Sequence, residues 1–224
     1  QVATGDMAPV MMGSGVNAQG ANALMNAIVR YFPSPERAAR DSGVDLTTGE
    51  HFVANYKPDV NLSMKVFKTI ADPFIGKYSL VKVLTGVLRA ESELFNTVKE
   101  VEEKSGKIYV LRGKEAIEVT ELRPGDIGAM AKLNETETGD TLARKQAPIL
   151  YNAPQISKPY TYKAYVAKNK GDEDRIASGL AKLMEEDRTL RAEVDAENRQ
   201  SLLYGIGDQQ LDIVVSKLAS RYKA

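Results

Sequence analysis

Gly13-Ser14-Gly15 is a glycine-rich turn that could hold a polar ligand with its backbone amides and the Ser14 hydroxyl. It follows Pro9-Val10-Met11-Met12 and directly precedes a helical pattern. Glycine permits tight turns and lets a ligand approach the backbone closely. By itself the motif predicts only a turn, because most glycine-rich turns do no more than reverse the chain.

A second candidate is Asn169-Lys170-Gly171-Asp172, which has the sequence of the guanine-specificity tetrapeptide of GTPases. In a working guanine site this tetrapeptide follows a buried strand, and a phosphate-cradling Gly-x-x-x-x-Gly-Lys-Ser/Thr lies far upstream. No Gly-Lys pair in this sequence is followed by Ser or Thr. We therefore interpret Asp172 as a helix N-cap whose carboxylate accepts a hydrogen bond from the first free amides of the helix.

The acidic run Glu185-Glu186-Asp187 could supply a pair of carboxylates for acid–base chemistry. Adjacent residues on a helix do not face each other, and the C-terminal end of a helix is an ordinary place for solvated charge. We interpret the run as solvated and predict no catalytic residue. The chain has no cysteine and one histidine, His51, so we predict no metal site either.

Basic side chains on or beside the expected barrel strands are candidates for contact with RNA phosphates. They are Lys65, Lys68, Lys82, Arg112 and Lys114. Strand lysines more often protect a solvated sheet edge, and only their clustering in three dimensions decides between the two interpretations. Thirty basic and thirty acidic side chains cancel, so the overall charge predicts no affinity for nucleic acid, and a local patch would have to supply it.

The elements that position these residues begin with a helix. Apolar side chains recur at the spacing of one helix face, at Leu24, Ala27, Ile28 and Tyr31. They predict a helix over Ala21–Tyr31, which the following prolines end. Such a short helix cannot stay folded alone, so we expect Leu24, Ile28 and Tyr31 to be docked on the barrel or on another molecule.

Residues 62–147 are predicted to form a β-barrel of six or more strands. Short runs rich in Val, Ile, Leu and Tyr alternate with Gly, Asp and Pro turns, at Met64–Ile70, Tyr78–Leu84, Ile108–Leu111, Ile117–Val119 and Ile127–Ala131. Linkers are predicted on either side, over residues 41–61 and 148–158, because the first lacks periodicity and prolines interrupt the second.

Residues 159–224 predict a ferredoxin-like β-α-β-β-α domain that lacks its last strand. The elements are Tyr160–Val166, a helix from about Asp172 to Glu186, strands near Leu190–Val194 and Ser201–Tyr204, and a helix over Asp208–Tyr222. Each helix has one apolar stripe with which to pack on the sheet. Without a final strand, we expect an open sheet edge at Tyr160–Val166 that is able to pair with a neighbouring chain. The fold class is thus multidomain, β followed by α+β.

The composition is that of a folded protein without membrane spans. Hydrophobic residues make up 43% and charged residues 27% of 224 positions, which is typical of soluble globular domains and leaves room for two of them. No apolar run is long enough to span a bilayer, and no secretory signal is evident. We expect a cytoplasmic protein.

The middle of the chain resembles, element by element, the second domain of bacterial elongation factor G. The resemblance rests on an ordered set of turns: Ala71-Asp72-Pro73-Phe74, Gly86-Val87-Leu88, Pro124-Gly125-Asp126-Ile127 and Thr138-Gly139-Asp140-Thr141-Leu142. Pro9 through Pro35 resembles the end of the GTPase domain of that family, and residues 180–187 resemble a helix-to-strand corner of its third domain.

This resemblance implies that Gly13, Ser14 and Gly15 belong to a loop that lends backbone amides and a serine to guanine. The family usually has Ala where this chain has Gly15, which would leave the loop less preorganised. The family commonly has Leu and His at Gln209 and Gln210, so the role of that imidazole cannot be carried over, and a divergent paralogue is suggested.

The resemblance further implies that residues 1–40 are the remnant of a GTP-binding domain. The phosphate-binding and switch motifs, with GTP and Mg²⁺, would then lie upstream of Gln1, and this fragment alone would hold no cofactor and be inactive. The intact protein would be a ribosome-dependent GTPase that drives translocation, with the barrel anchored on ribosomal RNA and the third domain moving about a hinge at residues 147–158.

The implied partners are the ribosome, its RNA, and the protein's own GTPase and C-terminal domains, with no membrane and no DNA. One alternative is a ribosomal protection or recycling GTPase of the same superfamily. Another is an RNA-binding barrel module with no GTPase activity, although such a module has no use for the loop between Pro9 and Pro35.

Overall fold

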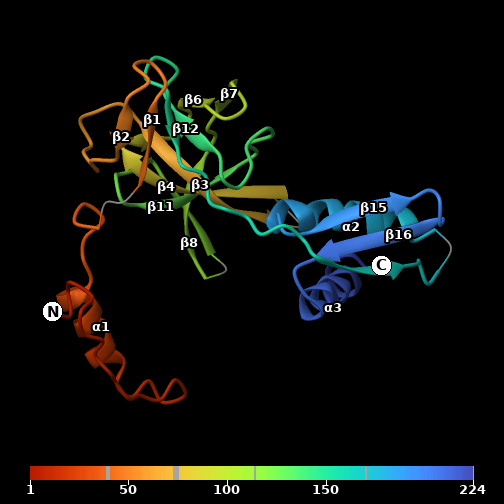
Figure 1. The fold of residues 1–224 in the computed structure, drawn as a ribbon. Helices are drawn as coiled ribbons and strands as arrows, with labels where there is room; N and C mark the ends of the chain where they lie inside the picture. The colour runs from red at the N-terminus through yellow and green to blue at the C-terminus, as the bar shows by residue number, and fades with distance from the viewer. Residues whose placement is uncertain (39–40, 73–75, 114, 170, 224) are drawn as a thin grey trace. The chain divides into compact units, whose positions relative to one another are not determined.

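The computed structural model describes residues 1–38, 41–72, 76–113, 115–169 and 171–223. The chain divides into two compact units, Gln1–Arg40 and Asp41–Ala224 (Figure 1). Pro73, Phe74 and Lys114, which the sequence analysis singles out, lie outside the described residues. Among the described helices, none is long and apolar enough to cross a membrane.

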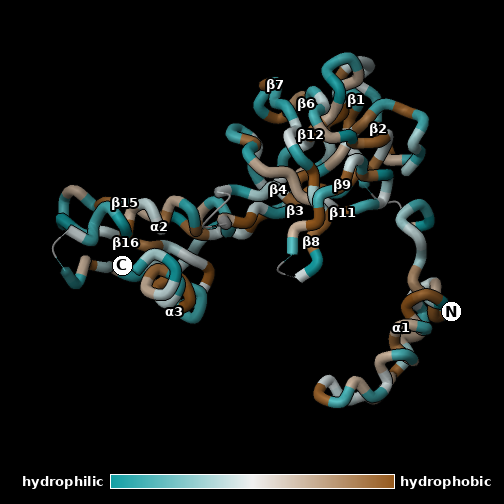
Figure 2. Tube along the Cα trace, turned by 180° about the vertical axis from the view of Figure 1, so that it is seen from behind, coloured by the Kyte–Doolittle hydropathy of each residue, from teal (hydrophilic) through white to brown (hydrophobic). Residues whose placement is uncertain are grey.

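The first unit contains helix α1 (Ala21–Tyr31), with the predicted bounds. Hydrophobic residues recur along it (Figure 2). The helix nevertheless buries no side chain, and Leu24 and Ile28 are 51% and 37% exposed. Among the described residues of this unit α1 is the only helix, so the docking of Leu24, Ile28 and Tyr31 on the barrel or on another molecule stays a prediction.

The second unit contains the predicted barrel, built on an antiparallel sheet of eight strands in the order β7-β6-β12-β3-β4-β11-β8-β9. The strands are β3 (Ser63–Asp72), β4 (Gly76–Thr85), β6 (Glu93–Asn96), β7 (Val101–Lys104), β8 (Ile108–Arg112), β9 (Glu115–Val119), β11 (Ile127–Ala131) and β12 (Thr141–Ala143). A short pair, β5 (Leu88–Arg89) and β10 (Glu121–Leu122), completes it.

The barrel core is an apolar cluster whose residues alternate along the strands as the pleat requires. Met64 and Val66 on β3 and Val81 and Val83 on β4 are at most 1% exposed. All five predicted runs lie within strands of the sheet, in β3, β4, β8, β9 and β11. The strands β6, β7 and β12 were not predicted, because they are only three or four residues long and are defined by their pairing partners.

The segment predicted as the first linker carries two strands, β1 (Ser42–Asp45) and β2 (His51–Val53). They form a three-stranded sheet with β13 (Ile149–Tyr151), which lies within the second predicted linker. These strands are too short to show periodicity, and β1 and β13 pair across a long stretch of sequence, so local patterns could not reveal them. Residues 152–158 are in neither helix nor strand.

The C-terminal part has the predicted β-α-β-β-α order. Its elements are β14 (Thr161–Tyr165), α2 (Glu173–Glu186), β15 (Arg191–Asp195), β16 (Gln200–Gly205), α3 (Asp208–Lys217) and a π-helical turn η1 (Leu218–Tyr222). The sheet order is β14-β16-β15, and the apolar stripes of the helices pack with Leu203 of β16 in one core cluster. Among the described residues β14 pairs only with β16, so its outer edge is open, as predicted.

Candidate functional site

The glycine-rich turn of the first unit is closed by a backbone bridge. The amide of Ser14 donates to the carbonyl of Gln19 at 3.0 Å. A Cβ atom on Gly13 would lie 2.6 Å from the Gln19 oxygen, and one on Gly20 would lie 2.7 Å from the Met12 oxygen. The two arms of the loop therefore approach so closely that both positions require glycine.

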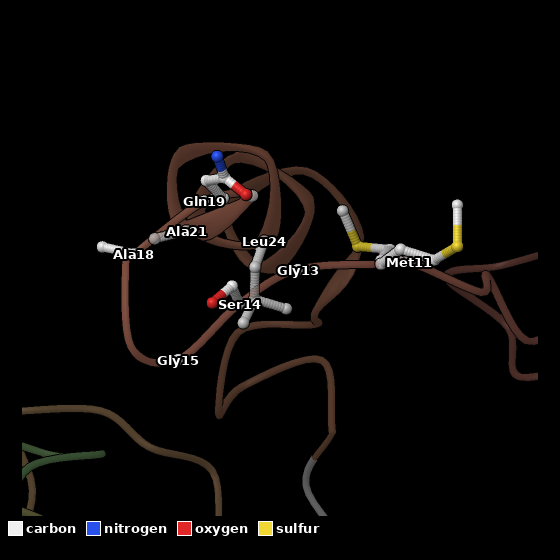
Figure 3. Close-up of a pocket in the computed structure, with 10 residues that line it drawn as sticks. Met11, Gly13, Ser14, Gly15, Ala18, Gln19, Ala21 and Leu24 are labelled. Carbon is white, nitrogen blue, oxygen red and sulfur yellow. The ribbon is translucent and has the colours of Figure 1, made fainter.

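The loop borders a cavity of about 390 Å³, lined also by Met11, Met12 and Leu24 (Figure 3). The three predicted site residues, Gly13, Ser14 and Gly15, all line it.

The polar groups of this loop form few hydrogen bonds within the protein. The Ser14 Oγ accepts a long hydrogen bond of 3.4 Å from the amide of Asn17, and within the described chain the amides of Gly15 and Val16 donate to no group. Apolar walls beside free amides and a weakly engaged hydroxyl suit a planar ring with a polar edge.

Gly15 itself is not required by the packing of the loop. A Cβ atom at this position would meet no heavy atom within 4 Å, and its φ lies outside the left-handed region. The structure therefore accommodates glycine at this position but does not require it, and the alanine that is usual in the family would also fit.

The tetrapeptide at residues 169–172 does not form a base-reading site. Asn169 donates its side-chain amide to Asp172 Oδ2 at 3.0 Å, and Arg175 donates to Asp172 Oδ1 at 3.2 Å. Asp172 holds the N-cap position of α2 but caps no backbone amide, so the predicted capping bond is wrong. Its carboxylate is occupied by the two side chains instead. Lys170 lies outside the described residues.

The acidic run at the end of α2 is structural. The side chain of Glu186 is only 13% exposed. Its Oε1 accepts a hydrogen bond from the Ala71 amide at 3.0 Å and forms an ion pair with Arg221 at 3.3 Å. Its Oε2 lies 3.7 Å from Lys217 Nζ. The prediction of solvated charge is wrong for this residue, because folding brings barrel strand β3 and the last helical turn against it. No paired carboxylate site results.

Gln210, one of the two departures noted in the sequence, links three segments. Its Oε1 accepts from the Ile206 amide at 2.7 Å, and its Nε2 donates to Asp187 Oδ2 and Thr189 Oγ1, each at 2.7 Å. Burial acts to raise the pKa of Asp187, but the hydrogen bonds from Thr189 and Gln210 outweigh it and lower that pKa. Gln209 is exposed.

The predicted basic residues do not gather into one patch. Lys65 and Lys82 both pair with Asp41, at 3.4 and 3.2 Å. Arg112 pairs with Glu115 at 2.8 Å. Lys68 is exposed, as expected for a strand lysine at a solvated surface. Lys114 lies outside the described residues.

Asp41 ties the sheet that contains β1 to the barrel. Tyr56 donates its hydroxyl to Asp41 at 2.9 Å, and Lys82 Nζ lies 5.2 Å from the centre of the Tyr56 ring. Burial acts to raise the pKa of Asp41, yet the hydrogen bonds from Tyr56 and Lys82 and the two lysine charges together lower it. Both lysines are therefore paired within the protein, although their side chains remain 23% and 33% exposed.

Sequence reasoning missed a different set of basic residues. Arg89, on β5, and Arg144, directly after β12, line one hollow of about 200 Å³ on the barrel. Arg89 directly follows the Gly86-Val87-Leu88 turn, but no spacing rule joins it to a residue so far along the chain.

Three of the four turn motifs that carry the family resemblance lie wholly among the described residues and form turns of the barrel. Gly86 has φ of 66°, and a Cβ atom there would lie 2.6 Å from the Cα atom of Leu62. The Asp126 carboxylate accepts from the Arg123 amide at 2.8 Å. Asp140, 4% exposed, accepts from the side chain of Asn96 at 2.8 Å. Across the described chain no three His, Asp or Glu side chains converge as metal ligands would.

Two protein-family models match the chain, one after the other. Residues 61–145 match the model described as elongation factor G domain 2, and residues 156–224 match elongation factor G domain III. These ranges coincide with the barrel and the β-α-β-β-α part. A crystal structure of a protein from Thermus thermophilus is similar over 94% of this chain, with 26% identical residues and a TM-score of 0.73. The match covers 29% of the length of that protein.

Proposed function

This chain belongs to the elongation factor G family, and from this membership we propose that it is part of a translational GTPase that binds the ribosome and promotes GTP-driven translocation. The observation that carries the proposal is the pair of consecutive domain matches, over residues 61–145 and 156–224, in the order of the family. Translation elongation is the activity for which the family is named.

In this proposal the barrel anchors the protein on ribosomal RNA, and the C-terminal part moves relative to it. A continuous apolar core gives such an anchor a fixed framework, which is what the structure contributes to the first role. The connection through residues 152–158, which is exposed and lacks secondary structure, supports the second, since a hinge needs backbone freedom.

The loop of Gly13, Ser14 and Gly15 would hold the guanine ring of GTP, the substrate of the intact enzyme. The Ser14 hydroxyl and the amides of Gly15 and Val16 are the groups able to bond the polar edge of the ring, and the cavity beside them is large enough for a planar base. Hydrolysis of the terminal phosphoanhydride of GTP would supply the free energy for movement. No described residue is assigned to the phosphates or to Mg²⁺.

Co-sedimentation of the chain with ribosomes over a salt series, without nucleotide and then with GTP, tests the proposal. We expect binding that weakens as salt rises and is the same with and without GTP, because recognition would reside in the barrel. Absence of binding at every salt concentration would contradict a ribosome-anchoring role for these domains.

A further inference from the structure

Two side chains of the C-terminal part, Glu186 and Arg188, bond directly to the barrel. Glu186, the last residue of α2, accepts a hydrogen bond on Oε1 from the Ala71 amide near the end of β3, at 3.0 Å. Arg188 Nη1 donates to the Thr138 carbonyl at 3.0 Å and lies 3.0 Å from Glu137 Oε2. Residues 186–188 therefore hold two barrel segments that are far apart in the sequence.

The residue between them, Asp187, is fixed within the C-terminal part. Its Oδ1 accepts from the Thr189 amide at 3.0 Å, and its Oδ2 accepts from the Gln210 side chain at 2.7 Å. The segment that carries Glu186 and Arg188 is thus held by its own domain. The two side chains are presented to the barrel at little further cost in conformational entropy.

The seam between the barrel and the C-terminal part is not sealed by a shared apolar core. Among the described residues, the core cluster of the barrel and that of the C-terminal part have no member in common. Where Glu137 meets Arg188, a cavity of about 330 Å³ lies beside Met184 and Leu190. Domains whose interface is neither large nor apolar move relative to each other by default.

Opening this seam would leave the carboxylates on both sides paired. On the barrel side, Glu137 lies 3.0 Å from Lys99 Nζ. On the other side, Glu186 keeps its ion pairs with Arg221 and Lys217. The Arg188 side chain is already 41% exposed, so water can replace its partners. Because no buried charge is stranded, the contacts can break and form again without a large penalty.

We propose that Glu186 and Arg188 form a latch that holds the C-terminal part docked on the barrel and that opens when the C-terminal part moves. The latch itself follows from the contacts across the seam. Its use, to set when the C-terminal part is released during translation, rests on the proposed function. A latch of this kind biases an equilibrium between a docked and an open arrangement of two domains that each keep their own core.

Native-state hydrogen exchange at the Ala71 amide tests the latch, because this amide donates to Glu186 across the seam. Arg188→Gln should speed its exchange by about tenfold, through the loss of one partly exposed ion pair and one hydrogen bond. Exchange at Val83 in the barrel and at Leu203 in the C-terminal part should not change, because each lies within one domain. Each variant is first melted to confirm folding.

Two further variants separate the latch from a general loss of charge. Arg175→Gln is the matched control, since Arg175 lies on α2, is 63% exposed and pairs with Asp172 inside the C-terminal part. It should leave exchange at Ala71 unchanged. Glu137→Gln removes the barrel partner of Arg188, so adding it to Arg188→Gln should not speed exchange at Ala71 further.

A distance between the two parts decides the outcome. The chain has no cysteine, so Lys68→Cys on the barrel and Gln209→Cys on α3, both exposed positions, can each carry one spin label. The distribution of distances between the labels should broaden in Arg188→Gln and not in Arg175→Gln. An unchanged distribution would overturn the latch even if exchange at Ala71 were faster, because loosening of the end of β3 would explain that exchange.

The latch and the proposed function can fail separately, since neither measurement needs ribosomes. If the chain co-sediments with ribosomes but Arg188→Gln leaves the distribution unchanged, the latch is overturned and the proposed function stands. If Arg188→Gln broadens the distribution but the chain binds no ribosomes, the latch stands as a property of the fold and its use in translation is overturned.

Discussion

The barrel and the C-terminal β-α-β-β-α part are stabilised in different ways, although one follows the other in the chain. The barrel buries hydrogen-bonded polar groups among its apolar side chains: Ser63 Oγ lies 2.6 Å from Thr85 Oγ1 and 2.7 Å from Tyr151 Oη. In the C-terminal part the core cluster is apolar, and the corner around Gln210 carries a dense set of polar contacts. A buried polar network specifies one arrangement, whereas an apolar sandwich tolerates adjustment.

This difference fits the roles proposed for the two regions. A recognition surface must be rigid if its charged groups are to be preorganised. A part that moves benefits from a core whose elements can shift slightly. Substitutions that crowd the barrel should therefore destabilise it more than similar substitutions destabilise the C-terminal part.

The largest effect is expected for Gly86→Ala in the barrel. The residue has φ of 66°, and the added Cβ atom would lie 2.6 Å from backbone atoms of Leu62, whose carbonyl accepts a hydrogen bond from the Arg144 amide. We expect a decrease of about 2–4 kcal/mol in the free energy of unfolding. Native-state hydrogen exchange at the Val83 amide measures it, since that amide lies on β4 three residues before Gly86 and donates to the Asp126 carbonyl.

Gly106→Ala is the matched control, because its Cβ atom would meet no heavy atom within 4 Å and its φ lies outside the left-handed region. It should change the exchange of Val83 hardly at all. If Gly86→Ala behaved like the control, the rigidity assigned to the barrel would be wrong.

The next effect is expected for Gln210→Ala, which removes three hydrogen bonds from the polar corner of the C-terminal part. The free energy of unfolding should fall by about 1–3 kcal/mol, because the Ile206 amide and Asp187 are left with fewer partners in a partly buried place. Native-state hydrogen exchange at the Leu203 amide measures this decrease in the free energy of unfolding. The neighbouring Gln209→Ala, at an exposed position, should have no comparable effect. Equal effects of the two variants would show that this corner is not where the C-terminal part is held.

The fold was predictable from sequence where an element carries its own signal. Helix α1 and strands β3, β4 and β8 have clear periodicity, so their positions emerged from local pattern. Strands β1 and β13 did not, since each has three or four residues and is defined by its partner. The same holds for site residues: those adjacent in sequence could be predicted, and those brought together by the fold could not. Gly13, Ser14 and Gly15 are adjacent in sequence and line one cavity together, whereas Arg89 and Arg144 converge only through the fold.

Acid should weaken the barrel through Asp41, by a smaller amount. The pKa of Asp41 is lowered from its ordinary value of 3.8, so its stabilising contribution is present above that pH and is lost as pH falls through the lower, folded pKa. The difference in unfolding free energy between the wild-type chain and Asp41→Asn should therefore be constant near neutral pH and shrink below pH 3.8. A difference that grew on acidification would contradict the lysine and tyrosine contacts assigned to this carboxylate.

The smallest effect is expected for Gly179→Ala in α2, the counterpart of the barrel substitution. Its Cβ atom would lie 2.7 Å from Leu218 Cδ2 and 3.1 Å from the Tyr222 ring, which are side-chain atoms able to shift. Alanine also favours a helix over glycine by about 1 kcal/mol, which offsets much of the crowding. We expect the free energy of opening, measured by hydrogen exchange at the Leu203 amide, to change by less than about 1 kcal/mol. A decrease as large as that of Gly86→Ala would show that the C-terminal core is as unyielding as the barrel, and the contrast between the two regions would then rest on their polar groups alone.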